Sequence, residues 1–285
     1  MDDAAKAYQN NQACDEGIKR ECTILGWRYK KGEGVEQDDG KAVALFQQAC
    51  EGGDALGCTY LGLMYAKGRG IEQSYTKAAE LYQKSCRGGD ARGCTNLGIL
   101  HYRGQGLEKS DKKASLFHEQ ACKGGYARGC YNLASLYRMG KGVSQNDVKA
   151  ARLYKSACKG GNSKGCTALG WMHKEGRGVE LDDILAASFY EKGCRRGNAR
   201  GCTNLGWMYQ RGRGVALSDT KAVALYQKSC QELDLLGCTN LGWMYKEGKG
   251  VKQDDNKALS FYRFACEKGD VLGCEKVDEH YSGGF

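Results

Sequence analysis

The residues of this chain best suited to chemistry are its sixteen cysteines, which form eight Cys-x7-Cys pairs, each 36 residues after the last. Zinc needs four ligands, usually with about two to four residues between paired cysteines, whereas each pair here supplies only two. An even count with one repeated spacing therefore predicts disulfides rather than metal sites or free thiols, and an oxidising compartment. The predicted bonds are Cys14–Cys22, Cys50–Cys58, Cys86–Cys94, Cys122–Cys130, Cys158–Cys166, Cys194–Cys202, Cys230–Cys238 and Cys266–Cys274.

The constant period predicts a stacked array of helical hairpins, because a fixed period of about 20–50 residues marks repeats that bury their apolar faces against one another. In residues 58–93, apolar side chains at i, i+3, i+4 and i+7 predict helix A, which ends at Gly68, and helix B, which begins near Ser74. Eight residues along one helix would separate paired cysteines by ~12 Å, too far for a disulfide. The chain must therefore turn between helix B and the next helix A.

The repeat extends over the whole chain, so we expect one repeat domain, 1–285. It would begin with a lone helix B at 2–14, continue through seven A–B units of period 36 from about 22 to 266, and end with a short helix A at 273–281. At one turn the usual Gly-Gly is replaced by Glu232 and Leu233. We expect this replacement to reshape the hairpin there, because glycine favours the left-handed conformation after a helix.

The charge pattern gives little sign of nucleic-acid or membrane binding. The net charge of +9 comes from 43 basic and 34 acidic residues that are interspersed along the chain without a basic run. No apolar stretch approaches the ~18 residues of a membrane span. The first residues lack the apolar region of a signal peptide, so an exported protein would be a trimmed form. We expect a monomer that binds neither nucleic acid nor membrane.

Each repeat also carries the string Leu-Gly-x-Met-Tyr-x-x-Gly-x-Gly-Val followed by Ser/Asp-x-x-Lys-Ala-x-x-x-Tyr-x-x-Ala/Ser-Cys, as at 205–230 and 241–266. These strings resemble Sel1-like repeats, relatives of tetratricopeptide repeats, and the added cysteine pair is similar to the Helicobacter cysteine-rich protein family. The resemblance implies an all-α, right-handed α/α superhelix that binds proteins or peptides and is secreted or periplasmic. A mitochondrial intermembrane-space factor with such repeats indicates a second compartment. Some family members are described as weak penicillin-binding proteins or β-lactamases.

The residues themselves argue against catalysis. Ser-x-x-Lys, the nucleophile string of serine β-lactamases, occurs at Ser74, Ser110 and Ser218. Aspartate or asparagine takes the same position in other repeats, which indicates helix N-caps. His101, His118 and His173 replace aromatic residues of other repeats, so we expect them to pack rather than bind metal. We expect no catalytic residue, cofactor or metal.

A second stripe on helix A, at positions equivalent to 59, 60, 63, 66 and 67, is the candidate binding surface. Asparagine amides can both donate to and accept from a peptide backbone, tryptophan supplies apolar contact, and cations hold acidic groups. Packing of the tryptophans and local bonding of the asparagines are the competing interpretations. The predicted function is a scaffold that binds a protein or an extended peptide in a concave groove lined by the A helices. The alternative that the family resemblance implies is a weak penicillin-binding protein or β-lactamase. The predicted contact residues are Asn96, Asn132, Asn204, Asn240, Trp171, Trp207, Trp243, Arg103, Arg138, Lys174, Gln210 and Lys246.

Overall fold

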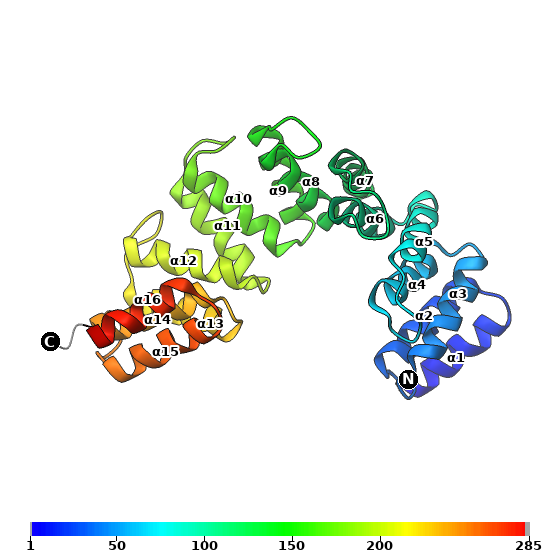
Figure 1. Cartoon of the computed structure of the whole chain (residues 1–285), viewed down its shortest axis with the longest axis horizontal. Coiled ribbons are helices and arrows are strands. Elements are labelled where there is room, and N and C mark those ends of the chain that lie inside the picture. The colour runs from blue at the N-terminus through cyan, green and yellow to red at the C-terminus, as the bar shows by residue number, and fades with distance from the viewer. Residues whose placement is uncertain (1, 283–285) are drawn as a thin grey trace. The chain divides into compact units, whose positions relative to one another are not determined.

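The structure is a computed structural model that describes residues 2–282, and its regular elements are sixteen α-helices, α1 to α16 (Figure 1). The odd-numbered helices are the predicted B helices and the even-numbered ones are the A helices. Their bounds are α1 (Asp3–Asp15), α2 (Lys19–Lys31), α3 (Asp39–Glu51), α4 (Ala55–Lys67), α5 (Tyr75–Arg87), α6 (Ala91–Arg103), α7 (Asp111–Lys123), α8 (Ala127–Met139), α9 (Asp147–Lys159), α10 (Ser163–Glu175), α11 (Asp183–Arg195), α12 (Ala199–Arg211), α13 (Asp219–Gln231), α14 (Leu235–Glu247), α15 (Asp255–Glu267) and α16 (Val271–Ser282).

The helices form two compact units, an N-terminal unit up to Asn146 and a C-terminal unit from Asp147. Within each unit every helix packs against the next along the chain, and each A helix also contacts the next A helix. The A helices therefore form a continuous row in each unit. The chain is an all-α solenoid of helical hairpins, as the period predicts. No helix in the described part of the chain is long and apolar enough to cross a membrane.

Short polar side chains and glycines set the helix ends. The Asp38 and Asp254 carboxylates accept the backbone N–H groups of Lys41 and Lys257 in the first turns of α3 and α15, so these B helices begin at a side-chain cap. Each A helix from α2 to α14 ends at a glycine in the left-handed conformation, such as Gly68 with φ 63°. These local signals explain why the boundaries recur with the sequence period.

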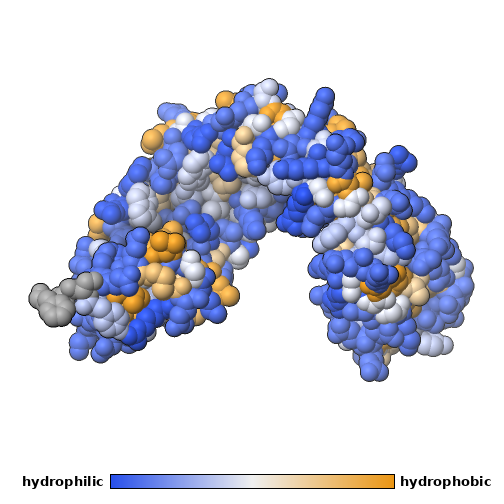
Figure 2. All heavy atoms as spheres, in the orientation of Figure 1, coloured by the Kyte–Doolittle hydropathy of each residue, from blue (hydrophilic) through white to orange (hydrophobic). Residues whose placement is uncertain are grey.

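In six of the hairpins an aromatic ring of helix B lies against a glycine of helix A, whereas α8 has Ala134 at the position of the glycine. A Cβ atom on Gly206 would come within 2.7 Å of the Tyr226 ring, and one on Gly242 within 2.7 Å of Tyr262. These rings are almost fully buried, and their burial is the main apolar contribution to hairpin packing. In Figure 2, hydrophilic residues cover most of the visible surface of both units and apolar residues form separate patches.

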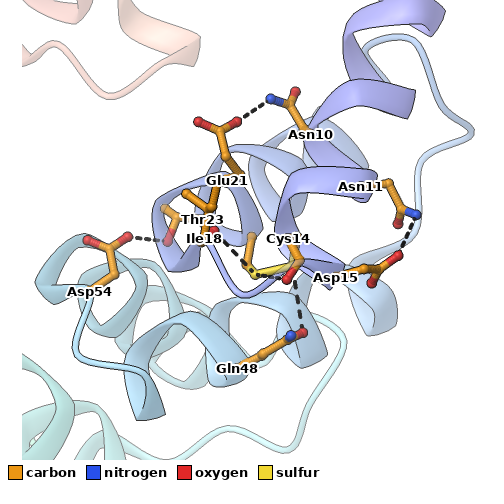
Figure 3. Close-up of a disulfide and its surroundings, with 10 residues drawn as sticks. Asn10, Asn11, Cys14, Asp15, Ile18, Glu21, Thr23, Gln48 and Asp54 are labelled. Atoms are coloured by element: carbon orange, nitrogen blue, oxygen red, sulfur yellow. Dashed lines mark hydrogen bonds between the residues drawn. A yellow bond between two sulfur atoms is a disulfide. The ribbon is translucent and has the colours of Figure 1, made fainter.

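All eight predicted disulfides are present, four in each unit. Their Cα–Cα separations lie between 4.5 and 4.7 Å, which shows that the chain does turn between helix B and the next helix A. Figure 3 shows the first bond, where Gln48 of α3 approaches the Cys14 sulfur from the next repeat. Each bond therefore holds the joint between consecutive hairpins.

The turn at Glu232 and Leu233 keeps the geometry of the other turns, so the expectation of a reshaped hairpin was wrong. The Leu233 N–H donates to the Cys230 carbonyl and the Asp234 N–H to the Ser229 carbonyl, as the corresponding glycine turns do. Leu233 achieves this with φ 62°, the only positive φ of a non-glycine residue in the described chain. The side chain therefore carries a conformational cost of ~1–2 kcal/mol that glycine would avoid.

Neighbouring repeats are also joined by a buried hydrogen bond. The Thr203 hydroxyl of α12 donates to the Asp234 carboxylate at the start of α14, 31 residues further on. Thr59 donates to Asp90 at the same spacing. Figure 3 shows the equivalent bond from Thr23 to Asp54. A buried hydroxyl that binds a carboxylate stabilises the interface between repeats.

Replacing Thr203 with valine should lower the free energy of unfolding by ~1.5–3 kcal/mol, because the Asp234 carboxylate loses a buried donor. Thr95 is the matched control: it is equally buried, but its hydroxyl donates to the Ala91 carbonyl of its own helix. Thr95→Val should cost less than ~1 kcal/mol. Urea denaturation followed by circular dichroism measures both, and equal costs would contradict a role for the Thr–Asp bond.

Candidate functional site

The twelve predicted contact residues all lie on A helices. The N-terminal unit holds four, on α6 and α8, and the C-terminal unit holds eight, on α10, α12 and α14. Because neighbouring A helices are in contact, equivalent positions form a stripe along the row in each unit. The N-terminal residues are Asn96, Arg103, Asn132 and Arg138, and the C-terminal residues are Trp171, Lys174, Asn204, Trp207, Gln210, Asn240, Trp243 and Lys246.

The asparagines form one adjacent pair in each unit. Asn96 and Asn132 occupy equivalent positions of α6 and α8, and Asn204 and Asn240 those of α12 and α14. All four side chains are partly exposed. Within residues 2–282 their amides make no hydrogen bond to another part of the protein. Local bonding therefore does not occupy these amides in the structure, and their donors and acceptors remain available to a ligand.

The tryptophans are partly buried and contact both the core and nearby cations. Trp171 and Trp207 pack against a buried cluster formed by α11 and α12, which belong to consecutive hairpins. The Lys174 ammonium lies 4.9 Å from the centroid of the Trp207 ring, and the Lys249 ammonium 4.8 Å from that of Trp243. Such cation–π contacts fix the rings and leave less of their faces open. The tryptophan rings therefore pack against the core, as the competing interpretation expects, and they also keep some surface exposed to solvent.

Two predicted contact residues are already engaged inside the fold. The Gln210 amide oxygen accepts a hydrogen bond from the Tyr226 hydroxyl at 2.9 Å, and its nitrogen approaches the Met244 sulfur at 3.6 Å. Lys174 pairs with Glu175 at 2.8 Å. These contacts orient the two side chains at the surface of the stripe. They also mean that a ligand would have to compete for the Gln210 amide.

The threonines at positions equivalent to 59 do not belong to the exposed stripe. Thr59, Thr203 and Thr239 are each at most 2% exposed and bind aspartates of the following repeat. The helical spacing places them beside the stripe, but the next A helix covers them. The candidate surface is therefore confined to positions equivalent to 60, 63, 66 and 67.

A set of loop arginines was missed in the sequence. The Arg213 guanidinium makes two hydrogen bonds of 2.9 Å to the Asp183 carboxylate at the start of α11, and its central carbon lies 5.5 Å from the Trp207 centroid. Arg177 is placed likewise against Asp147 and Trp171. A cation between the two glycines of five of the seven Gly-x-Gly loops was the available signal, since Glu33 and Gln105 take this position in the other two. These arginines tie the loop to the preceding repeat and position the tryptophans.

The Ser-x-x-Lys strings are helix caps. The hydroxyls of Ser74, Ser110 and Ser218 accept the backbone N–H of the lysine three residues on, at 3.2 to 3.4 Å. The ammonium groups of Lys77 and Lys221 lie over the rings of Tyr65 and Tyr209. In these two strings the lysine amine is therefore held against a tyrosine ring.

Replacing all three serines with alanine should leave any hydrolysis of the β-lactam nitrocefin unchanged, because the structure uses the hydroxyls as caps. The same variant should lose ~0.5–2 kcal/mol of stability per site. An absorbance assay for nitrocefin and a thermal melt measure the two effects. Loss of a turnover that the parent protein possesses, without unfolding, would assign the serines a catalytic role.

A Sel1 repeat profile matches seven consecutive segments, residues 22–54, 55–90, 91–126, 127–162, 163–198, 199–232 and 235–270. The chain belongs to the Sel1 repeat family. In this Sel1 repeat protein every hairpin joint also carries a Cys-x7-Cys disulfide, which distinguishes the cysteine-rich type. No curated protein matches the chain significantly.

Solved structures of other Sel1 repeat proteins are similar. A protective antigen present in uropathogenic Escherichia coli strains, which displays an SLR fold, is 29% identical with a TM-score of 0.82, over 98% of this chain and 60% of that chain. This chain thus spans 60% of the length of the antigen. A Sel1 repeat protein from Oxalobacter formigenes is 24% identical with a TM-score of 0.77, over 96% and 80% of the two chains. Helicobacter pylori cysteine rich protein B is 30% identical over 46% of this chain and 93% of that chain, with a TM-score of 0.38.

Proposed function

We propose that this Sel1 repeat protein binds an extended peptide segment of a partner protein along its A helices, in a secreted or periplasmic setting. Sel1 repeats typically build protein-binding scaffolds. The compartment is supported by the eight disulfides and the absence of free cysteines in residues 2–282, since disulfides persist in oxidising environments. The proposal gives no catalytic role to the chain.

The asparagine pairs are the observation that carries the proposal. Asn204 and Asn240 lie at equivalent positions of α12 and α14, partly exposed and without hydrogen bonds to the rest of the described chain. A carboxamide beside a peptide backbone can accept from its N–H and donate to its C=O, irrespective of the peptide sequence. Trp207, on the same helix face one turn away, adds apolar contact area, which is enriched at binding hot spots.

The test is selection of peptides from a random display library on the oxidised protein. Peptides retained by the parent should bind the Asn204→Ala/Trp207→Ala variant at least about tenfold more weakly, a loss of ~1.4 kcal/mol. Asn204→Ala alone, which removes no hydrogen bond within the described chain, should weaken binding several-fold. The matched control Lys228→Ala/Asn256→Ala changes exposed residues of B helices and should bind as the parent does. Equal binding by all variants, or no retained peptide, would overturn the proposal.

A further inference from the structure

A hollow of 250 Å³ lies in the N-terminal unit between α6, α7 and α8. Its lining includes Arg103 and Asn132 of the candidate surface, together with His118 of α7 and Arg128 of α8. Apolar walls come from Ile99 and other residues of the A helices. The hollow therefore opens beside the stripe that the Asn96–Asn132 pair occupies.

The hollow coincides with a change of residue in the repeat. His118 occupies the position that is tyrosine or phenylalanine in the other hairpins, where Tyr226, for example, reaches Gln210 through its hydroxyl at 2.9 Å. The His118 ring packs against Gly98 as those rings pack against their glycines. An imidazole is shorter than a phenol, so it does not fill the space that the hydroxyl end would occupy.

His118 is a buried polar group without a partner. Its side chain is 3% exposed, and its Nδ1 atom is buried with no hydrogen-bond partner among the described residues. Burial, with a smaller contribution from Arg128, lowers the pKa of His118 to about 4, so the ring is neutral at pH 7. Because Nδ1 lies against Gly98, Nε2 is the ring nitrogen that a ligand in the hollow would reach, and in the neutral ring Nε2 can carry the donated proton.

Arg128 is a cation whose usual counter-ion is missing. Its counterparts pair with aspartates: Arg20 with Asp54, Arg92 with Asp90, and Arg200 with Asp234. Arg128 has no aspartate at either of these positions: Tyr126 stands two residues before it and Asn162 stands 34 residues after it. Within the described chain Arg128 forms no ion pair. None of the residues that line the hollow is acidic. The site thus combines Arg103 and Arg128 with an unpaired imidazole.

We propose that this hollow binds the carboxylate side chain of a glutamate or aspartate in an extended peptide. The carboxylate accepts a hydrogen bond from the His118 imidazole N–H and pairs with Arg128 and Arg103, while Asn132 binds the adjacent peptide backbone. A volume of 250 Å³ lies below the ~300–1,000 Å³ of drug-sized pockets and suits a single side chain. The assignment rests on the proposed peptide-binding function. It adds that the bound peptide carries an acidic residue at this hollow.

The experiment uses three pentapeptides and the imidazole NMR resonances of the oxidised full chain. One is N-acetylated, C-amidated Ala-Ala-Glu-Ala-Ala, the second replaces its glutamate with glutamine, and the third is acetylated pentaalanine with a free C-terminal carboxylate. The glutamate peptide should shift the His118 resonances and bind about tenfold more tightly than the glutamine peptide. His118→Tyr, which installs the residue of the other repeats, should abolish this difference.

Matched variants distinguish binding in the hollow from non-specific attraction of an acidic peptide to the basic protein. His101→Tyr makes the same exchange in the same hairpin but outside the hollow, and should keep the preference for glutamate. Arg128→Gln should weaken the glutamate peptide at least about fivefold, whereas Arg92→Gln, whose arginine pairs with Asp90, should not. Equal binding of the glutamate and glutamine peptides, unchanged binding by His118→Tyr, or binding of the terminal carboxylate alone would overturn the assignment. None of these outcomes changes the result of peptide selection with the Asn204 and Trp207 variants, which tests the proposed function in the other unit.

Discussion

Reduction of the eight disulfides should lower the melting temperature of this Sel1 repeat protein by ~20–40 °C. Each bond closes a loop with a sequence separation of 8, which corresponds to about 2.5 kcal/mol in the chain-entropy model. Each unit holds four bonds and is close to 140 residues long. Reduction should therefore lower the free energy of unfolding of each unit by about 10 kcal/mol. For a unit of this size, each kcal/mol lowers the melting temperature by ~2–4 °C. Circular dichroism melts with and without a phosphine reductant measure the shift.

A variant that lacks one disulfide shows whether the eight bonds contribute equally to the loss of stability on reduction. Cys86→Ser/Cys94→Ser removes one bond from the N-terminal unit and should lower its melting temperature by ~5–10 °C. A reduced protein that melts within a few degrees of the oxidised one would show that helix packing alone holds the hairpin joints. Alkylation of the reduced thiols before the melt keeps the bonds from re-forming.

Gly214→Ala should destabilise the C-terminal unit by ~2–5 kcal/mol. Gly214 has φ +67°, and a Cβ atom there would lie 2.1 Å from the Asp183 carbonyl oxygen of the preceding repeat. The left-handed conformation costs alanine ~1–2 kcal/mol. The clash is with backbone rather than a flexible side chain, so the loop must also move away from α11, which adds ~1–3 kcal/mol. Urea denaturation of the oxidised protein measures the change.

The same substitution at Gly197 is the matched control. Gly197 also has a positive φ, 78°, but a Cβ atom there would meet nothing within 4 Å. Gly197→Ala should therefore cost only the ~1–2 kcal/mol of backbone strain. Similar losses for the two variants would show that the approach of the Gly214 loop to Asp183 contributes nothing to the contact between repeats.

The features that could be predicted from the sequence are those with short-range causes. The Cys-x7-Cys pairs, the serine caps and the glycine helix ends depend on residues at most eight positions apart, so their spacing identified them. Leu233 shows the limit of that reasoning, because packing of the hairpins on either side imposes a turn that its local preference opposes. Local propensity is a weak prior where tertiary contacts decide.

The candidate surface was harder to delimit because neighbouring repeats decide which side chains are covered. Thr203 lies beside the stripe on its own helix, but its contact with Asp234 comes from the following repeat. The Gln210 amide oxygen accepts a hydrogen bond from Tyr226 of the B helix in its own hairpin, a contact that the helix A pattern alone does not show. The exchange of tyrosine for histidine at position 118 is visible in the sequence, whereas the hollow requires the positions of α6 and α8.

The position of the disulfides has a consequence for how the chain acquires them. Eight cysteines already allow about 105 pairings, and sixteen allow far more. Here each cysteine pairs with a partner only eight residues away, across the turn between helix B and the next helix A. Each bond can therefore form as soon as that short stretch of chain reaches an oxidising environment, before the next repeat is available. Oxidation in order along the chain avoids the search among distant thiols that a disulfide-rich protein with interlaced bonds must make.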